Sequence, residues 1–429
     1  MRRIEDEAKG WRWGVAAALA LAVIALLPQL QMWRARGHDW HGSAFSFFFD
    51  EAAYESYINA LIEGRPRLSD PYTGRDDTPA APQAESLFSI QFIPAYACAL
   101  PARLFNLSAA TVFIVLWPLV AFVTTLALTR LLCVVTGDER TAATLALFVL
   151  CCCTFIQKAV RSLRGLETAY LPLPFLRRYL PALPFAFFFI FCLLVWRALA
   201  TDDRRISRAH AFFAGLTFAL LVYSYFYLWT AAAAWLVCLA VLWLAAAPAR
   251  RRRRAARPLA VVAALAALSL APYAWLLARR APTMNTAQAL VHTRAPDLFR
   301  TSELLGALAL VVVIMGARRG WLAWRDRRVL LSASFALTPF AVFNQQLLTG
   351  RSLQPIHYEQ FIANYVSLLA LALAVVLVLN GRAARVGGGQ AGVPRKLLAS
   401  VALVSLAWAA IEVTVATRHA SHLNLWSDE

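Results

Sequence analysis

The sequence predicts an all-α protein that crosses a membrane many times. Of its 429 residues, 60% are hydrophobic and only 15% are charged, which is far more apolar than an ordinary soluble domain. The mean hydropathy of +0.57 indicates the same class. The apolar residues occur in blocks of roughly 17–25, the length that a helix needs to cross about 30 Å of hydrocarbon.

The charge and the cysteines fit this class. A net charge of +18 would suggest a nucleic-acid partner in a soluble chain, but in a membrane protein cytoplasmic loops collect arginine and lysine, so we expect no nucleic acid. The seven cysteines lie inside or at the edge of apolar segments and form no CxxC pair, which predicts small buried hydrophobic side chains. The apolar N-terminal run lacks a small-residue cleavage site and predicts an uncleaved first span.

The number of spans depends on one segment. The first span covers about Trp11 to Met32, a polar stretch follows, and residues 86–107 are apolar but interrupted by Pro94 and Pro101. If residues 86–107 lie on the outer surface, every dense basic run falls on one side, including residues 250–254. If they span the membrane, that run faces outward, against the positive-inside rule. We therefore predict eleven spanning helices. The later spans begin near Ser108, Thr141, Leu180, His210, Leu228, Pro258, Glu303, Val329, Phe361 and Leu397.

The predicted organisation is a single transmembrane domain over residues 1–429. It comprises a first external loop with juxtamembrane helices at 33–107, a helical part at 108–257, and C-terminal transmembrane helices at 258–429. We expect a multi-pass protein of the plasma (inner) membrane, with a cytoplasmic N-terminus and an external, periplasmic C-terminus.

Two adjacent acids follow a run of phenylalanines in the first external loop. In the stretch SAFSFFFDEAAYESY, Asp50 and Glu51 begin a predicted short helix that Gly64 and Pro66 end. Asp50 and Tyr54 share a face of this helix. One interpretation is that Asp50 only caps the helix. The other is that Asp50 and Glu51 form a catalytic site at the membrane rim.

The remaining polar residues of the predicted outer loops favour the second interpretation. Arginines outside the membrane run against the targeting bias, and arginine forks match phosphate oxygens, although single ones can snorkel to lipid head groups. A carboxylate facing such loops suits a general base opposite a phosphate leaving group. The residues that we expect to bind substrate or phosphate are Tyr54, Arg161, Arg164, Glu167, Arg177, Arg178, Arg351, His357 and Tyr358.

The sequence offers no clear ligand set for a metal. Asp76 and Asp77 are adjacent and His38 and His41 lie three apart, but neither pair has a third partner at a defined spacing. A divalent cation remains a possible cofactor, but the sequence shows no clear set of ligands for one.

The layout resembles the GT-C superfamily of membrane glycosyltransferases, in particular a bacterial branch related to protein O-mannosyltransferases and aminoarabinose transferases. The resemblance rests on Phe49-Asp50-Glu51 after the first span, Asp70-Pro71-Tyr72, the turn at 104–108, and the run Arg177 to Pro181. Asn344-Gln345-Gln346 and His357-Tyr358 complete it. The resemblance covers the chain best up to about residue 240.

This resemblance implies inverting transfer of a sugar from a polyprenyl-phosphate donor to an unknown acceptor (a glycan, lipid or protein) at the outer face, with Asp50 as the catalytic acidic residue and Glu51 in support. Glu167 is the only acid of the second predicted outer loop, residues 157–180, and the DxD motif of the oligosaccharyltransferase branch is absent. Two alternatives stay open: a transporter or flippase of a lipid-linked glycan, and a catalytically inactive GT-C-like subunit. Charges at the helix ends rather than the midplane favour the enzyme.

Overall fold

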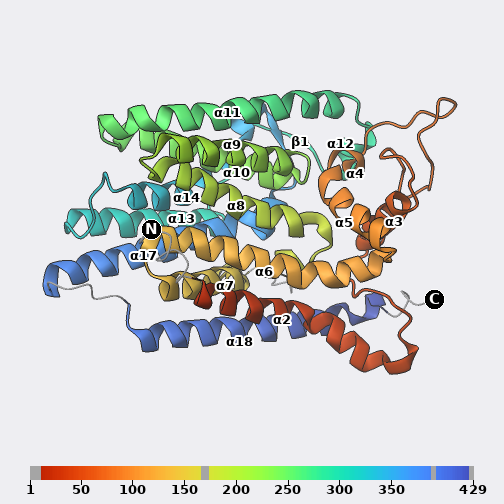
Figure 1. The fold of residues 1–429 in the computed structure, drawn as a ribbon, viewed down its shortest axis with the longest axis horizontal. Helices are drawn as coiled ribbons and strands as arrows, with labels where there is room; N and C mark the ends of the chain where they lie inside the picture. Colours follow the sequence, from red (N-terminus) through yellow and green to blue (C-terminus); the bar gives the residue numbers. More distant parts are fainter. Residues whose placement is uncertain (1–10, 166–172, 388–392, 425–429) are drawn as a thin grey trace.

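The computed structural model describes residues 11–165, 173–387 and 393–424, and it is a bundle of long helices (Figure 1). Within these residues, ten helices are long and apolar enough to cross a membrane. The prediction of an all-α polytopic membrane protein is confirmed. The two strands, β1 (Val291–His292) and β2 (Arg351–Ser352), form one small antiparallel ladder.

The long helices follow the predicted spans closely. They are α2 (Arg12–Arg36), α6 (Ala109–Thr136), α7 (Glu139–Leu163), α8 (Tyr179–Ala200), α9 (Arg204–Val222), α10 (Phe226–Ala246), α11 (Ala249–Ala278), α13 (Thr301–Arg318), α17 (Asn364–Gly387) and α18 (Arg395–Ala420). The π-helix η3 (Glu359–Ala363) joins α16 (Pro355–Tyr358) to α17, and the three form one candidate span.

The predicted span near Val329 forms α14 (Arg327–Phe343), which has 17 residues and lies among α10, α13 and α17. A helix of this length is about 25 Å long, at the lower limit for crossing a bilayer. Its neighbours bury it: Trp235 of α10 stacks on Phe335 of α14 with ring centroids 5.2 Å apart. α14 is therefore a core helix of the bundle.

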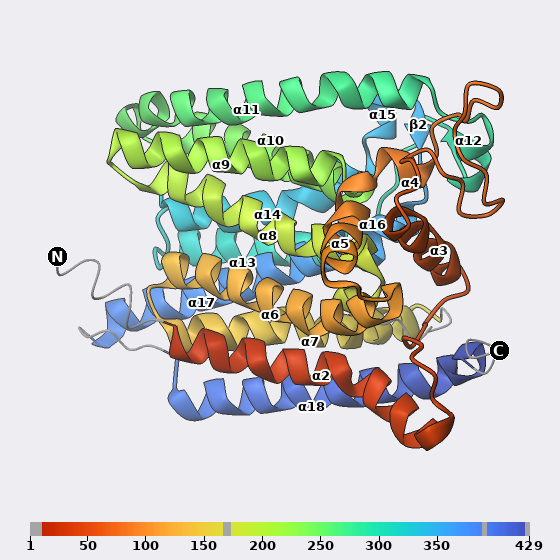
Figure 2. The same cartoon turned by 45° about the vertical axis from the view of Figure 1, so that its right-hand side comes forward.

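Residues 86–107 do not form a spanning helix. They fold into α4 (Leu87–Ile90) and α5 (Phe92–Phe105), and α5 has only 14 residues, too few to cross the hydrocarbon. Asn106 ends α5 in the left-handed conformation with φ of 53°. Figure 2 shows α5 running across the direction of the long helices. This agrees with the placement of the segment outside the membrane.

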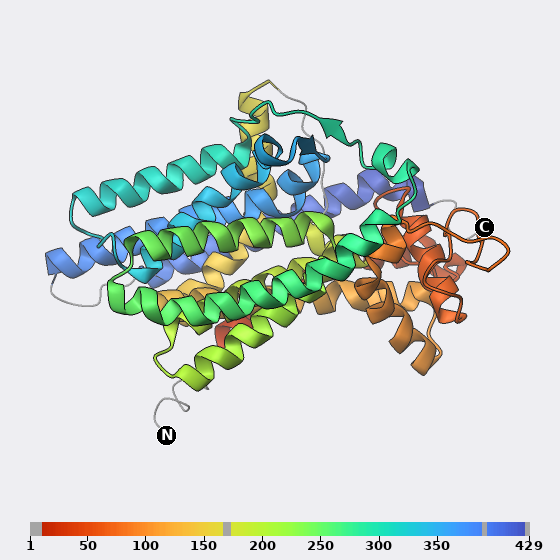
Figure 3. The ribbon, with the colours of Figure 1, turned by 90° about the horizontal axis from the view of Figure 1, so that it is seen from above.

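The bundle has two chemically different ends. At one, which we call the α3 end, lie α3 (Glu51–Ile62), α4, α5 and α12 (Thr283–Ala287), as Figures 1 and 3 show. At the other, the arginine end, lie the connections α8–α9, α10–α11 and α13–α14, which carry the dense basic runs (Figure 2). α2 begins at the arginine end and α18 finishes at the α3 end. The short elements η1 (Gly37–Asp39), η2 (Pro174–Leu176), α15 (Gln346–Thr349) and η4 (Ser421–Asn424) complete the chain.

Candidate active site

Asp50 and Glu51 lie where α3 begins, at the α3 end of the bundle. The Asp50 side chain is 52% exposed, whereas that of Glu51 is fully buried. The backbone N–H of Phe47 donates a hydrogen bond of 3.1 Å to Oε2 of Glu51. Although Asp50 occupies the N-cap position, its side chain accepts no capping hydrogen bond from the helix as the structure describes it. Capping does not explain why an acid stands there.

The two acids face Arg177 and Arg178, which come from the second predicted outer loop. Nη2 of Arg177 lies 2.9 Å from Oδ2 of Asp50, and its Nε lies 3.8 Å from Oε1 of Glu51. Nε of Arg178 lies 3.5 Å from Oε2 of Glu51. Both arginine side chains are buried, Arg178 almost completely. More than 120 residues of sequence separate the partners, so the fold itself assembles this cluster.

Two further residues complete the ion cluster. Nη2 of Arg178 donates to Oγ of Ser46 over 2.5 Å and lies 3.5 Å from Oε2 of Glu55. Three carboxyl groups therefore surround two guanidinium groups. Ser46 and Glu55 were not among the predicted site residues, although Glu55 follows Glu51 by one helical turn. That spacing is the signal that could have identified it.

Burial and charge act in opposite directions on the cluster. Burial raises the pKa of Glu51 above its ordinary value, and Arg178 and Arg177 offset part of that shift. Burial opposes the charge on Arg177, but Glu51, Tyr54 and Asp50 hold its pKa above the ordinary value. Both arginines therefore stay positively charged, because a guanidinium group is not deprotonated in proteins.

The buried core of the cluster has hydrogen-bonding capacity that the protein does not use. Within the described residues, no hydrogen bond reaches Oε1 of Glu51, Nε of Arg177, or Nε and Nη1 of Arg178. Unused buried donors of this kind cost about 1–3 kcal/mol each.

Aromatic rings enclose the cluster. The Arg177 guanidinium lies over Phe48 at 4.1 Å and faces Phe361 at 5.9 Å, and Arg178 lies over Phe113 at 4.5 Å. Such cation–π contacts orient a guanidinium that few polar groups hold. Tyr54 packs edge-on against Tyr179 with ring centroids 5.3 Å apart. Burial, opposed by Arg177, raises the pKa of Tyr54 to about 12, so this phenol keeps its proton.

His357 borders the cluster through aromatic side chains. Its Nδ1 lies 3.5 Å from the hydroxyl of Tyr225, and its ring packs edge-on against Tyr227 at 4.8 Å. Tyr225 interacts electrostatically with Tyr54 and Arg177, and burial raises its pKa well above the ordinary value. Tyr225 connects His357 with the cluster, and no sequence pattern around Tyr225 indicated this.

The other predicted site residues lie elsewhere. Arg164 donates to the carbonyl of Phe299 at 2.9 Å, and Arg351 lies in β2 opposite His292. Tyr358 is buried and shares a hydrogen bond of 2.8 Å with Thr230, so it joins α16 to α10. Glu167 lies outside the described residues. Arg164 and Tyr358 tie neighbouring segments together, and Arg351 lies in the β1–β2 ladder.

Arg161 lies in a separate small cavity at the end of α7. The cavity measures about 70 Å³ and is lined by Thr154, Gln157, Lys158, Arg161, Ile356, Glu359 and Gln360. Nζ of Lys158 lies 2.7 Å from the Glu412 carboxylate on α18. This cavity combines basic side chains with α16 and η3, the elements that also carry His357 and Phe361.

Contacts among the outer segments hold this end together. Arg67 pairs with Glu85 at 2.6 Å within the first external loop, and the backbone of Glu85 bonds to Arg279 and Ala281, which follow α11. Arg300 joins Asp297 at 2.7 Å and Glu359 at 3.0 Å, which ties the segment between α11 and α13 to η3. The loops around the cluster thus form one connected surface.

No group of three or more His, Cys, Asp or Glu side chains in the described residues is arranged to hold a metal ion.

No family model and no curated protein matches the chain. Among solved structures it is similar to the AglB oligosaccharyltransferase of the archaeon Archaeoglobus fulgidus. The structure of AglB with an inhibitory peptide and a dolichol-phosphate is 17% identical, with a TM-score of 0.48. The structure of the same enzyme tethered to an acceptor peptide is 16% identical, with a TM-score of 0.46. Each match covers 96% of this chain but only 56% of the other, so the chain spans about half the length of these structures.

Proposed function

We propose that this chain is a membrane glycosyltransferase of the GT-C type, which transfers a sugar from a polyprenyl-phosphate donor to an acceptor at the α3 end of the bundle. The observation that carries the proposal is the cluster itself. A half-exposed carboxylate, Asp50, contacts the buried Arg177 at the end of a bundle of membrane-spanning length. The residues proposed as general base and as anion-stabilising group therefore lie within one hydrogen bond of each other.

The proposed reaction is a single inverting displacement. Asp50 accepts the proton of an acceptor hydroxyl, whose oxygen then attacks the anomeric carbon of the donor sugar. The bond from that carbon to the phosphate oxygen breaks, and polyprenyl phosphate leaves with the electron pair. The proton on Asp50 passes to solvent, which reaches this side chain because half of it is exposed.

The arginines have two roles in this proposal. Arg177 stabilises the negative charge that develops on the leaving phosphate. Arg178 and Glu51 are positioning residues, because their burial and mutual contact fix the beginning of α3 and the direction of Arg177. Arg161, at the α7 cavity, is the second basic group proposed for the donor phosphate. The outer face of the membrane is the proposed location of the site.

The Asp50→Asn variant tests the proposal. It retains size and hydrogen-bonding groups but removes the base, so sugar transfer from polyprenyl-phosphate donors should fall by about 10²- to 10⁴-fold. Asp39→Asn is the matched control, because it makes the same change at an exposed residue of the same loop outside the cluster. Membranes with equal amounts of each protein are assayed for transfer with a panel of donor sugars.

Wild-type activity in Asp50→Asn at normal protein yield would reject Asp50 as the base. A wild-type chain that transfers no sugar from any donor of the panel, yet moves a lipid-linked glycan across the membrane, would favour the flippase alternative.

A further inference from the structure

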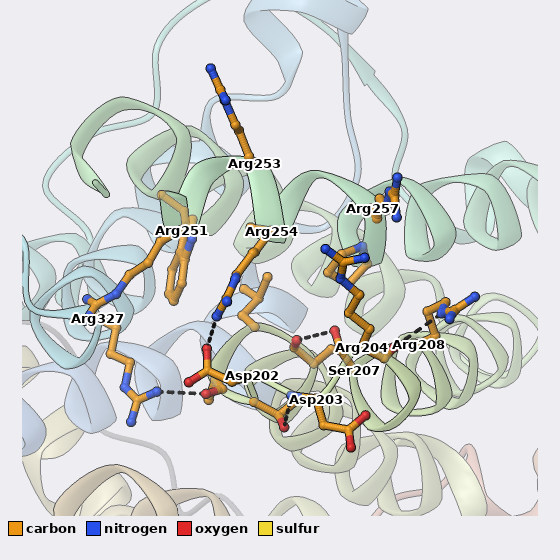
Figure 4. A pocket seen from close by; sticks show the side chains of 17 residues that line it. Asp202, Asp203, Arg204, Ser207, Arg208, Arg251, Arg253, Arg254, Arg257 and Arg327 are labelled. Carbon is orange, nitrogen blue, oxygen red and sulfur yellow. Dashed lines mark hydrogen bonds and ion pairs between the residues drawn. The ribbon is translucent and has the colours of Figure 1, made fainter. Parts of the chain in front are cut away.

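A second polar pocket lies at the arginine end of the bundle, opposite the candidate active site (Figure 4). Its volume is about 330 Å³, at the low end of the range of roughly 300–1,000 Å³ for ligand pockets. The turn between α8 and α9 forms its floor. The first turns of α11 and the beginning of α14 form its walls.

Positive charge dominates this pocket. Seven arginines line it, against two aspartates. Asp203 is already engaged, because its carboxylate accepts hydrogen bonds from the backbone N–H groups of Arg205 and Ile206 and caps α9. Asp202 pairs with Arg254 and is otherwise exposed. The carboxylates therefore neutralise only a small part of the arginine charge.

The arginines come from several segments and converge. Arg204 and Arg208 belong to α9, Arg251 and Arg254 to α11, and Arg327 to α14. Figure 4 shows Arg254 and Arg327 reaching the loop of Asp202 and Arg251 extending toward Arg327, while Arg253 points away. Nη1 of Arg327 donates to the carbonyl of Ala200 at 2.9 Å, which fixes its direction.

Membrane targeting alone does not require this convergence. The positive-inside rule counts basic residues in a loop and is indifferent to where their side chains point. The same run contains Arg250 and Arg252, which do not line the pocket. A partly open pocket bordered by arginines of three helices is instead the geometry of an anion site.

We propose that this pocket binds a phosphate group, in the form of the head group of an anionic phospholipid of the adjoining leaflet. The lining also contains Leu199, Trp243 and Pro258, so apolar side chains border the pocket beside the arginines. That combination suits a phosphodiester attached to glycerol and acyl chains, and basic pockets between transmembrane helices bind such head groups. This site does not depend on the glycosyltransferase proposal.

Native mass spectrometry of the full chain in detergent tests the proposal, with phosphatidylglycerol, phosphatidylcholine and inorganic phosphate as probes. The double variant Arg251→Gln/Arg254→Gln removes two pocket arginines. Since a basic residue near a lipid surface contributes about 1 kcal/mol, phosphatidylglycerol should bind about 30-fold more weakly. Arg250→Gln/Arg252→Gln removes the same charge from the same run outside the pocket and should change binding less than about 3-fold.

The probes separate the possible sources of the phosphate. The lipid assignment is supported if the chain prefers phosphatidylglycerol to phosphatidylcholine and if inorganic phosphate does not abolish this preference. Displacement of the lipid by millimolar inorganic phosphate would overturn the lipid assignment in favour of a soluble phosphate. Equal loss of lipid in the two double variants would reject the pocket and leave only diffuse charge. Unchanged elution of both variants in size-exclusion chromatography establishes that they fold.

Discussion

Replacing Glu51 with glutamine should destabilise the chain far more than the same change at its neighbour Asp50. Glu51 is fully buried between Arg177 and Arg178, and removing one partner of a buried ion pair typically costs about 3–5 kcal/mol. A glutamine oxygen can still accept the N–H of Phe47, so that hydrogen bond is not lost. Asp50 and Glu55 remain beside the arginines, which places the expected loss near the lower limit, about 3 kcal/mol.

Asp50→Asn is the internal comparison. Its side chain is half exposed, and ion pairs of exposed groups contribute about 0–1 kcal/mol. The free energies of unfolding of the two variants should therefore differ by about 2 kcal/mol or more. Each variant removes one negative charge, and the two positions are adjacent in the sequence. The double variant Glu51→Gln/Arg178→Met should recover part of the loss, because it also removes the arginine left without its partner.

Thermal unfolding in detergent, followed with a thiol-reactive dye, measures the difference. Cys151, Cys153 and Cys192 are buried in the bundle and become reactive only when it opens. Glu51→Gln should unfold several degrees below the wild type, and Asp50→Asn close to it. Equal midpoints for the two variants would refute the buried ion cluster as the stabilising element.

Two further predictions concern the first external loop. Burial opposes ionisation of Glu85, but hydrogen bonds from Arg67 and Ser89 lower its pKa below the ordinary 4.5. The ionised Glu85 therefore stabilises the fold above about pH 4.5, and this stabilisation is lost as the pH falls through the lowered pKa. When unfolding is followed by tryptophan fluorescence, acid should lower the unfolding midpoint of Glu85→Gln less than that of the wild type. Gly64 ends α3 with φ of +86°, and an added Cβ would lie 3.1 Å from the Arg103 guanidinium. Gly64→Ala should cost about 1–2 kcal/mol, and an unchanged midpoint would contradict this account of the turn.

Local patterns were sufficient to predict most of the helices. The helix expected between Asp50 and Gly64 is α3, and the break expected at 104–108 is where α5 ends and α6 begins. These features depend on apolar block length, helix stop residues and caps, all of which act within a few residues. The placement of residues 86–107 was predicted from the distribution of basic residues along the whole chain, and α5 is indeed too short to span.

The composition of the site was harder to predict because packing decides it. Arg177 and Arg178 were expected to bind substrate, but nothing in the sequence pairs either of them with Glu51, more than 120 positions away. Arg164 and Arg351 share the same residue type and lie in predicted outer loops, yet they do not contact the acids. Which arginine reaches the cluster depends on how α7 and α8 lie against α6, and no local pattern carries that information.

The conformation of Asp50 bears on whether the cluster is structural or functional. An aspartate at an N-cap normally stabilises its helix by about 0.5–2 kcal/mol by accepting backbone N–H groups. Asp50 stands at this position and turns its carboxylate to Arg177 instead. Because the side chain is half exposed, that ion pair contributes no more than the cap it replaces. Stability alone would not favour this exchange, and the exchange is what we expect if Asp50 is the proposed base, because the proposed role needs contact with both solvent and Arg177.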